Sequence, residues 1–577
     1  FGSRISASTI VTNDACLHCL VYNMGNYSSI PGSESSCCCR EKVSETSYNV
    51  LLIVCDQERR WEDLPLSAQD FQEAFPERTR LMKASTNFTQ ATICACPCTP
   101  ARSVLFSGRH LQETGCYTNN KDLPGNISVG NIFRASGYET ALFGKWHLHL
   151  RGRNFEGDKE SYDKWRELLL CRFGMDVEEE WPQPADFSGM LSEQGFDAWN
   201  EDGEANGFHE GHERDPDYAK KVVDFLQRRK EGDKPFLLCA NFVNPHDIMF
   251  FRASQNQENT RNKGGGLDIF EFAEEPSAIL YEKRWSFDTP RTLHYHDSTK
   301  DQNSQLPKAH LPHKRSVDGM FGKFSEDQED VDHRRNINYY INCLRDVDRN
   351  IGAVLKAVEE NPTLQKNTIV VFTSDHGEML GSHGQRQKGG LVYKENIGVP
   401  LLIRHPQVSI ESGREIDHIV SSVDIVPTIL SLAVGKERMQ KQQLPGHDLS
   451  EFVLKPDTTK WVRDENGALF QFGMLTGVPP NSDKAGHPGF RPLCQAIVTK
   501  QHVYGRFSYA WNFSQIKNCK AKKLEDLDDF DLVLYDRIAD PEETNNLAAC
   551  VGSASLILEM NDKLERLIEA EVDCQSK

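Results

Sequence analysis

The sequence predicts an α/β fold: a mixed, mostly parallel sheet flanked by helices, with a smaller C-terminal α+β subdomain that contains an antiparallel sheet. Three observations predict it. Continuous apolar runs such as Val50–Val54 are typical of strands buried on both faces of a parallel sheet. Helical patterns such as Tyr218–Arg229 and Ile337–Val358 lie between these runs, as in an α/β domain. Short β-like runs then cluster near the C-terminus, for example Gln495–Thr499 and His502–Tyr509.

Four of the apolar runs end at residues that can bind a metal ion or an anion. Val50–Val54 leads to Asp56 and Gln57, Glu139–Phe143 to Lys145 and His147, Phe236–Phe242 to His246, and Thr368–Phe372 to Asp375 and His376. Each of these residues taken alone would be interpreted as a helix cap or a surface charge. Because the carboxyl ends of parallel strands share the sheet edge where ligands bind, the four together predict one site.

Composition divides the chain into three parts. Residues 1–47 are rich in Ser, Gly, Asn and Cys without a clear period, which predicts a poorly ordered N-terminal extension. Residues 48–450 form the predicted main domain, with a polar insertion at about 250–335 whose long loops are expected to carry specificity. Residues 451–577 form the predicted C-terminal subdomain, which ends in an amphipathic helix over Ser553–Glu571.

Charge and hydropathy exclude several classes of partner. The 577 residues include 66 Lys and Arg against 85 Asp and Glu, a net charge of −19. So acidic a chain argues against nucleic acid or an anionic membrane as a partner, and an anionic substrate would need positive charge concentrated in a pocket. No apolar run reaches the ~18 residues that a membrane span needs. The sequence gives no indication of the oligomeric state.

Cysteine content and glycosylation sequons favour an oxidising compartment. The chain has 17 cysteines and four Asn-X-Ser/Thr sequons, at Asn26, Asn87, Asn126 and Asn512. Both are typical of a glycoprotein that is secreted or resides in the secretory pathway, lysosome or periplasm. The first residue is Phe, so we expect the native N-terminus, with any signal peptide, to be missing. Zinc ligation by Cys16, Cys19 and the triplet Cys37–Cys39 is disfavoured against disulfides or free thiols, since no regular second pair follows.

The segment Cys98-Thr99-Pro100-Ala101-Arg102 predicts the start of a helix. Proline suits the first turn, because its missing N–H would be unpaired there in any case. Leu105 and Phe106 supply a buried face, and Gly108 is a plausible C-cap. Cys98 would then lie at a helix N-terminus, where the backbone dipole favours anions.

This segment, with its continuation to Ser107-Gly108-Arg109, resembles the signature of type I sulfatases, the formylglycine-dependent members of the alkaline-phosphatase-like superfamily. The segment Phe143–Leu148 resembles their Gly-Lys-Trp-His sequence, and the likeness extends from about residue 48 to 550. The resemblance implies an alkaline-phosphatase-like fold and a sulfuric ester hydrolase. A formylglycine-generating enzyme would oxidise Cys98 to an aldehyde; one hydroxyl of its metal-held hydrate would attack sulfur and the other would later expel sulfate.

The resemblance also implies a set of metal ligands. Asp56, Gln57, Asp375 and His376 would bind one divalent cation together with the formylglycine oxygen made from Cys98. Calcium is the expected ion, with manganese and magnesium as alternatives. Gln57 and His376 stand where many sulfatases have aspartate and asparagine. This Asp-Gln and Asp-His pattern resembles choline sulfatases and phosphonate monoester hydrolases.

Five further positions match catalytic and substrate-binding residues of the family. Arg102 would hold the hydrate by charge-assisted hydrogen bonds, and Lys145 would bind a sulfate oxygen. His147 would take the hydrate proton, His246 would contact sulfate and the leaving oxygen, and Lys388 would complete the cationic cradle. Either His246 or Lys388 would protonate the leaving alcohol.

Several alternatives stay open. The same formylglycine could serve a phosphonate monoester or phosphodiester hydrolase, and a binding homologue without activity would keep Cys98 as a thiol. The sulfated substrate could be a small molecule or a carbohydrate, with choline and aryl sulfates also possible. Among the remaining histidines, His149 and His383 are possible pocket walls, whereas His209 and His212 are predicted to be solvated.

Overall fold

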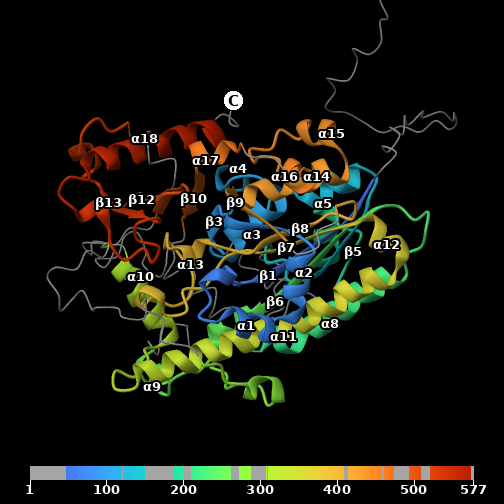
Figure 1. Cartoon of the computed structure of the whole chain (residues 1–577), viewed down its shortest axis with the longest axis horizontal. Coiled ribbons are helices and arrows are strands. Elements are labelled where there is room, and N and C mark those ends of the chain that lie inside the picture. The colour runs from blue at the N-terminus through green and yellow to red at the C-terminus, as the bar shows by residue number, and fades with distance from the viewer. Residues whose placement is uncertain are drawn as a thin grey trace, which may run out of the picture. The chain divides into compact units, whose positions relative to one another are not determined.

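The computed structural model describes residues 47–119, 121–149, 187–200, 209–261, 272–286, 307, 310–408, 413–455, 460–473, 493–508 and 520–573 (Figure 1). These residues belong to one compact unit, Val43–Lys577. The predicted N-terminal extension, with its cysteines and Asn26, lies outside the described residues apart from Ser47, as does Asn512.

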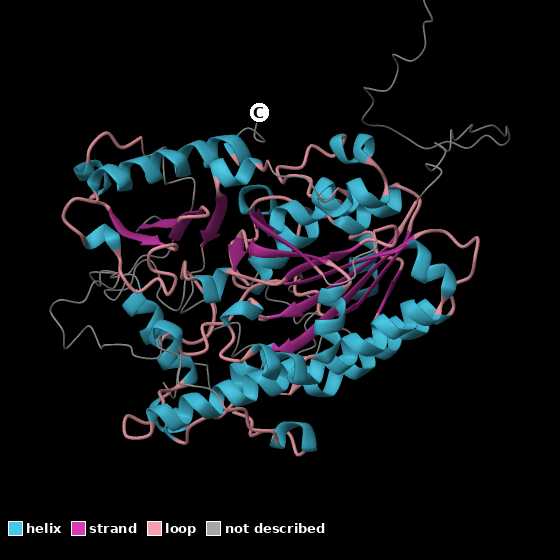
Figure 2. Cartoon of the chain, viewed as in Figure 1, coloured by secondary structure: helices cyan, strands magenta, loops and turns pink. Residues whose placement is uncertain are grey.

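The main sheet has eight strands, seven of which run in one direction (Figure 2). Only β8 runs antiparallel to its neighbours within this sheet. In spatial order the strands are β5 Ala198–Trp199, β4 Glu139–Gly144, β6 Phe236–Pro245, β1 Asn49–Asp56, β7 Thr368–Ser374, β8 Leu401–Arg404, β2 Thr86–Thr92 and β9 Arg414–Ser421.

The four strands predicted from apolar runs are confirmed, and they are consecutive in the sheet as β4-β6-β1-β7. The central strand β1 is buried along its whole length. Leu52 in β1 pairs with Cys239 in β6 and with Val371 in β7, all in parallel register. Because adjacent parallel strands end at the same edge, the polar residues that follow them are brought together.

Helices cover both faces of the main sheet (Figures 1 and 2). Alternate residues of β1 pack into two separate cores, Leu51 and Ile53 into one and Leu52 and Val54 into the other. The first core is closed by α2 Pro76–Lys83, α8 Glu210–Gln227 and α11 Glu329–Glu360. The second is closed by α3 Cys98–Ser107, α5 Val129–Ala135, α14 Ile425–Ala433 and α16 Ser450–Leu454.

A second sheet confirms the predicted antiparallel C-terminal layer. Its strands, in spatial order, are β13 Phe530–Asp536, β12 His502–Ser508, β11 Leu493–Val498, β10 Ala468–Phe472 and β3 Ala95–Cys96. Four of them are antiparallel neighbours, and β3 joins the edge in parallel with β10. Since β3 directly precedes α3, this sheet supports the chain that leads into Cys98.

A buried polar cluster fastens the C-terminal helix α18, Ala554–Glu571, to the rest of the unit. Glu571 accepts hydrogen bonds from Arg463 at 2.7 Å and from His110 at 3.1 Å. The other ring nitrogen of His110 lies 3.1 Å from the Cys94 sulfur. Arg463 also donates to both carboxylate oxygens of Asp424. The last helix is therefore tied by ion pairs to Arg463 and to His110, which follows α3.

The insertion at 250–335 is more regular than a long loop. Its described parts contain α9 Asn256–Thr260, a 3-10 turn at Ile279–Glu282 and α10 His310–Phe321. Helix α11 also begins at Glu329, eight residues before the helical pattern that the sequence shows at Ile337. A small apolar cluster that includes Phe250, Val317 and Phe321 explains why α10 packs rather than extending into solvent.

The described cysteines and sequons do not add to the argument for an oxidising compartment. All nine described cysteines are free, and eight of them are buried. Asn87 lies in β2 and is only 6% exposed, so this sequon cannot accept a glycan in the folded protein, whereas Asn126 is exposed. No helix in the described part of the chain is long and apolar enough to cross a membrane.

Candidate active site

Cys98 is the first residue of α3, as the sequence predicts. Pro100 occupies the first turn, and the Ala101 N–H donates to the Pro97 carbonyl at 2.9 Å. Gly108 ends the helix in the left-handed conformation with φ 67°, and a Cβ there would lie 2.9 Å from the Val426 side chain. Every residue of this helix is buried, so the position of Cys98 is fixed by packing.

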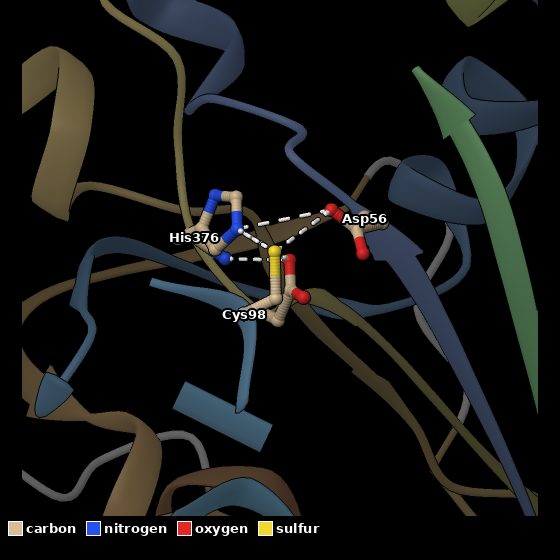
Figure 3. Close-up of side chains that lie close together, drawn as sticks. Asp56, Cys98 and His376 are labelled. Atoms are coloured by element: carbon tan, nitrogen blue, oxygen red, sulfur yellow. Dashed lines mark hydrogen bonds and ion pairs between the residues drawn. The ribbon is translucent and has the colours of Figure 1, made fainter. Parts of the chain in front are cut away.

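Two strand ends bring acidic and imidazole groups to Cys98 (Figure 3). The Cys98 sulfur lies 3.1 Å from Nε2 of His376, which follows β7. It lies 3.9 Å from Oδ1 of Asp56 at the end of β1, and His376 Nε2 is 3.7 Å from the same oxygen. With Asp375, these residues offer four ligand atoms that all lie within 4.8 Å of one another.

Arg102 joins the two carboxylates from one helical turn beyond Cys98. Its Nε donates to Asp375 Oδ2 at 2.9 Å, and one terminal nitrogen donates to Asp56 Oδ2 at 3.3 Å. The other terminal nitrogen donates to the Lys145 carbonyl at 2.9 Å. The side chains of Arg102, Asp56 and Asp375 are fully buried. Such a guanidinium offsets much of the repulsion between two converging carboxylates.

The remaining bonds of the carboxylates set their orientation. Asp375 Oδ1 accepts the backbone N–H groups of Gln57 at 3.1 Å and His376 at 2.9 Å. Asp56 Oδ2 lies 2.8 Å from the Lys145 ammonium, which leaves Oδ1 as the oxygen that faces Cys98. Burial opposes ionisation of Asp56, but the positive groups around it, Lys145 first, hold its pKa well below the usual range.

His376 is oriented to present Nε2 to Cys98. Its Nδ1 donates to the Gly377 carbonyl at 3.0 Å, which fixes the other nitrogen as the one facing the sulfur. Burial opposes protonation of His376, yet Asp375 and Cys98 raise its pKa to about 9. Burial and Asp56 oppose ionisation of the thiol, but Lys388 and His376 outweigh them and lower the pKa of Cys98.

Three cationic or imidazole groups from the predicted set surround this cluster. Lys145 is buried, and although burial opposes its protonation, Asp56 and Cys98 raise its pKa. Burial, followed by the charges of Lys145 and Lys388, lowers the pKa of the buried His246 well below its ordinary value. The half-buried Lys388 ammonium makes a short contact with the side-chain oxygen of Gln57 and lies 3.5 Å from the sulfur of Met249.

Three further histidines that the sequence singled out are His147, His383 and His149. The His147 carbonyl accepts a bond from Thr99 Oγ1 at 2.7 Å, which puts its backbone beside the residue after Cys98. His383 stacks on Tyr393 with ring centroids 3.7 Å apart, and His149 lies 3.8 Å from Asp122.

The prediction that His209 and His212 are solvated is met only in part: both residues are partly exposed, but each also has a hydrogen-bonding partner. His212 is half-buried, and its Nδ1 lies 2.6 Å from Asp346, while His209 Nε2 is 2.6 Å from the Glu274 carbonyl. The insertion and α11 supply both partners, which sequence spacing does not reveal.

Sequence reasoning missed two members of the site. The Gln57 amide nitrogen donates to Glu378 Oε2 at 2.5 Å and to Gln387 Oε1 at 3.3 Å. Glu378 lies two residues after His376, and Gln387 directly precedes Lys388. Their proximity to predicted site residues was the available signal, but the contact joins positions more than 300 residues apart.

The donor set fits a divalent cation. Two buried carboxylates and an imidazole nitrogen converge on the Cys98 sulfur. Hard oxygen donors suit calcium, magnesium or manganese, whereas an imidazole nitrogen is a more typical ligand of transition metals.

A model of the Sulfatase family matches residues 48–436. The chain belongs to the sulfatase family. It is 27% identical over 521 residues to the uncharacterized sulfatase YidJ of Escherichia coli K12, covering 87% of this chain and 82% of that protein. It is 25% identical over 541 residues to the ulvan-active sulfatase of Formosa agariphila, covering 92% and 84%.

Solved structures share the fold. A 2-O GAG sulfatase superposes with a TM-score of 0.62 at 19% identity, over 92% of this chain and 94% of that one. The phosphonate monoester hydrolase of Agrobacterium radiobacter gives 0.58 at 19% identity, over 91% and 96%. The predicted family, the fold class and the identification of the protein as a sulfatase enzyme are thereby confirmed.

Proposed function

We propose that this sulfatase hydrolyses a sulfate monoester with a nucleophile made from Cys98, releasing an alcohol and inorganic sulfate. One observation carries the proposal: Cys98 lies at a helix N-terminus, with Asp56, Asp375 and His376 around its sulfur and Arg102 behind them. A bare thiol is a poor nucleophile toward the sulfur of a sulfate ester. Conversion of Cys98 to formylglycine would explain why metal ligands surround this thiol, because the cation would then activate the hydrate oxygen that attacks sulfur.

The cation, the formylglycine hydrate and the surrounding side chains would each have a different role in the reaction. A divalent cation held by Asp56, Gln57, Asp375 and His376 would favour the ionised hydroxyl of the formylglycine hydrate, which supplies the attacking oxygen. Lys145 and Lys388 neutralise sulfate oxygens, which gain charge as the ester bond breaks. Asp56 keeps Lys145 protonated and in place through the 2.8 Å ion pair. His147, two residues after Lys145, takes the hydrate proton.

His246 and Lys388 are the two candidates to protonate the leaving alcohol. They can be distinguished by measuring the activity of each variant on esters whose leaving groups differ in their need for a proton. A nitrophenyl leaving group needs little protonation, whereas an alkyl or sugar alkoxide needs a full proton. The variant of the true proton donor should lose at least 10²-fold in kcat on an alkyl sulfate and much less on nitrophenyl sulfate. The other variant should lose activity on both substrates alike.

The maturation of Cys98 is the direct test of the proposal. Active enzyme, expressed with a formylglycine-generating enzyme, should give a Cys98 peptide with the mass of an aldehyde in place of a thiol. Cys98→Ala should abolish turnover and leave thermal stability close to that of the wild type. An intact thiol in fully active enzyme would refute the mechanism, and an intact thiol with no turnover on any ester would identify a binding homologue.

A second candidate function is hydrolysis of a phosphonate monoester or phosphodiester by the same nucleophile. The fold that this chain shares with the phosphonate monoester hydrolase of Agrobacterium radiobacter supports this candidate, since phosphoryl and sulfuryl centres have the same tetrahedral geometry. A panel of matched nitrophenyl sulfate, phenylphosphonate and phosphodiester should rank sulfate first in kcat/KM. A reversed ranking would assign the second function.

We also propose a substrate class, domain limits and a cellular setting for this enzyme. A 2-O GAG sulfatase has the same fold, and this likeness supports a sulfated carbohydrate, rather than another sulfate ester, as the substrate of this enzyme. We assign residues 48–450 to the catalytic domain and 451–577 to the C-terminal subdomain, and we place the protein in a secreted or lumenal compartment. Assaying sulfated sugars against choline sulfate tests the substrate class.

A further inference from the structure

Glu378 is a buried carboxylate at the back of the site. It is 1% exposed. Its Oε1 accepts the backbone N–H groups of Leu380 at 2.9 Å and Gln387 at 2.8 Å. Its Oε2 accepts the side-chain N–H of Gln57 at 2.5 Å. All three of these donors are uncharged amides, so this carboxylate is stabilised mainly by hydrogen bonds rather than by an ion pair.

These bonds determine which way the Gln57 amide faces. The nitrogen has two N–H groups, and Glu378 and Gln387 accept them. The oxygen accepts a bond from the Lys388 ammonium and keeps a second lone pair. In the opposite orientation the amide oxygen would face a carboxylate and the NH₂ group would face an ammonium. Both contacts would be repulsive, so charge selects one orientation.

We propose that Glu378 is a positioning residue that fixes the Gln57 amide so that its oxygen, and not its nitrogen, is presented to Lys388 and to the cation. The inference rests on the proposed function, which makes Gln57 a ligand. Only the oxygen of an amide can bind a hard cation. The same carboxylate closes the turn from Leu380 to Gln387 and thereby also sets the position of Lys388. One residue would thus align a metal ligand and a substrate-binding cation.

Exchange of donor and acceptor across the 2.5 Å contact tests this role. The variants are Glu378→Gln, Gln57→Glu and the double variant, and the probes are Ca²⁺ alone and Mn²⁺ alone, titrated by calorimetry. In Glu378→Gln, the NH₂ group of the new amide would face the NH₂ group of Gln57. Because these two donors repel each other, the Gln57 amide would rotate so that its oxygen faces position 378. We therefore expect Glu378→Gln to weaken cation affinity by about 10- to 100-fold.

The double variant restores the contact with its polarity reversed and with the same net charge. It should bind the cation more tightly than either single variant, within about threefold of the wild type. The kcat/KM for nitrophenyl sulfate should follow the same order. A matched control is Glu395→Gln, a buried carboxylate 3.8 Å from Arg59 and 3.6 Å from His383. This control should keep cation affinity within about threefold of wild type.

Wild-type cation affinity in Glu378→Gln would overturn the inference. So would equal losses in Glu378→Gln, the double variant and Glu395→Gln, because a merely structural role predicts no rescue. A wild-type protein that binds neither cation and cleaves no sulfate ester would overturn the proposed function, and this inference with it.

Discussion

Asp375→Asn should separate the structural role of this carboxylate from its role as a metal ligand. Asp375 accepts three N–H bonds, from Gln57, His376 and Arg102, and it is buried. Removing one partner of a buried ion pair costs about 3–5 kcal/mol. We expect the lower end, about 3 kcal/mol, because Arg102 keeps its bond to Asp56.

The larger effect should appear when metal is added. A ligand present at 100 times its Kd stabilises the folded state by about 2.7 kcal/mol. With an unfolding entropy of about 2.1 cal/mol/K per residue, that gain raises the melting temperature of so long a chain by roughly 2 °C. The wild type should show this rise in calcium or manganese after treatment with a chelator. Asp375→Asn should show no rise and should carry no bound metal.

Asp348→Asn is the matched control. Asp348 is also buried; it accepts the backbone N–H groups of Glu77 and Arg78 at 3.0 Å and pairs with the Arg78 guanidinium at 2.9 Å. It lies on α11, outside the group of metal-capable side chains. This variant should be destabilised by a similar amount and keep the full response to metal. A metal-dependent rise in Asp375→Asn, or its loss in Asp348→Asn, would refute the assignment.

Further predictions concern charge in the site and in the buried cluster. Lys145→Ala and Lys388→Ala should each lower kcat/KM by about 10²- to 10³-fold with an increase in KM. His147→Ala, in contrast, should mainly lower kcat. Wild-type kcat/KM in both lysine variants would show that these two lysines do not bind the sulfate group. Burial opposes protonation of His110, but Cys94 and Glu571 outweigh it and raise the pKa of this histidine to about 10. Its contribution to stability is therefore complete below pH 6.5 and lost as the pH rises through about 10. Thermal melting should fall more steeply between about pH 7 and 10 in the wild type than in His110→Asn, and equal slopes would contradict this.

The fold class, and the fact that several of the predicted site residues lie close together, could be predicted from the amino-acid sequence. The strands were predictable because a strand buried on both faces must be apolar throughout, and their polar ends stand out against that background. Asp56 is the last residue of such a strand, and Lys145, His246 and Asp375 directly follow three others, so parallel topology alone was enough to place them at one edge. The start of α3 at Cys98 was predictable for a local reason, since Pro100 and the capping glycine act within one helix.

How these groups bond to one another could not be predicted in the same way. That Arg102 spans both carboxylates, and that Glu378 holds Gln57 from 321 positions away in the sequence, depends on which strands are neighbours and on their register. The partners of His209 and His212 come from the insertion and from α11, whose packing no local pattern encodes. Periodicity reports the burial of a residue along its own element, whereas a hydrogen bond between distant elements depends on directions and distances that arise only when the whole chain has packed.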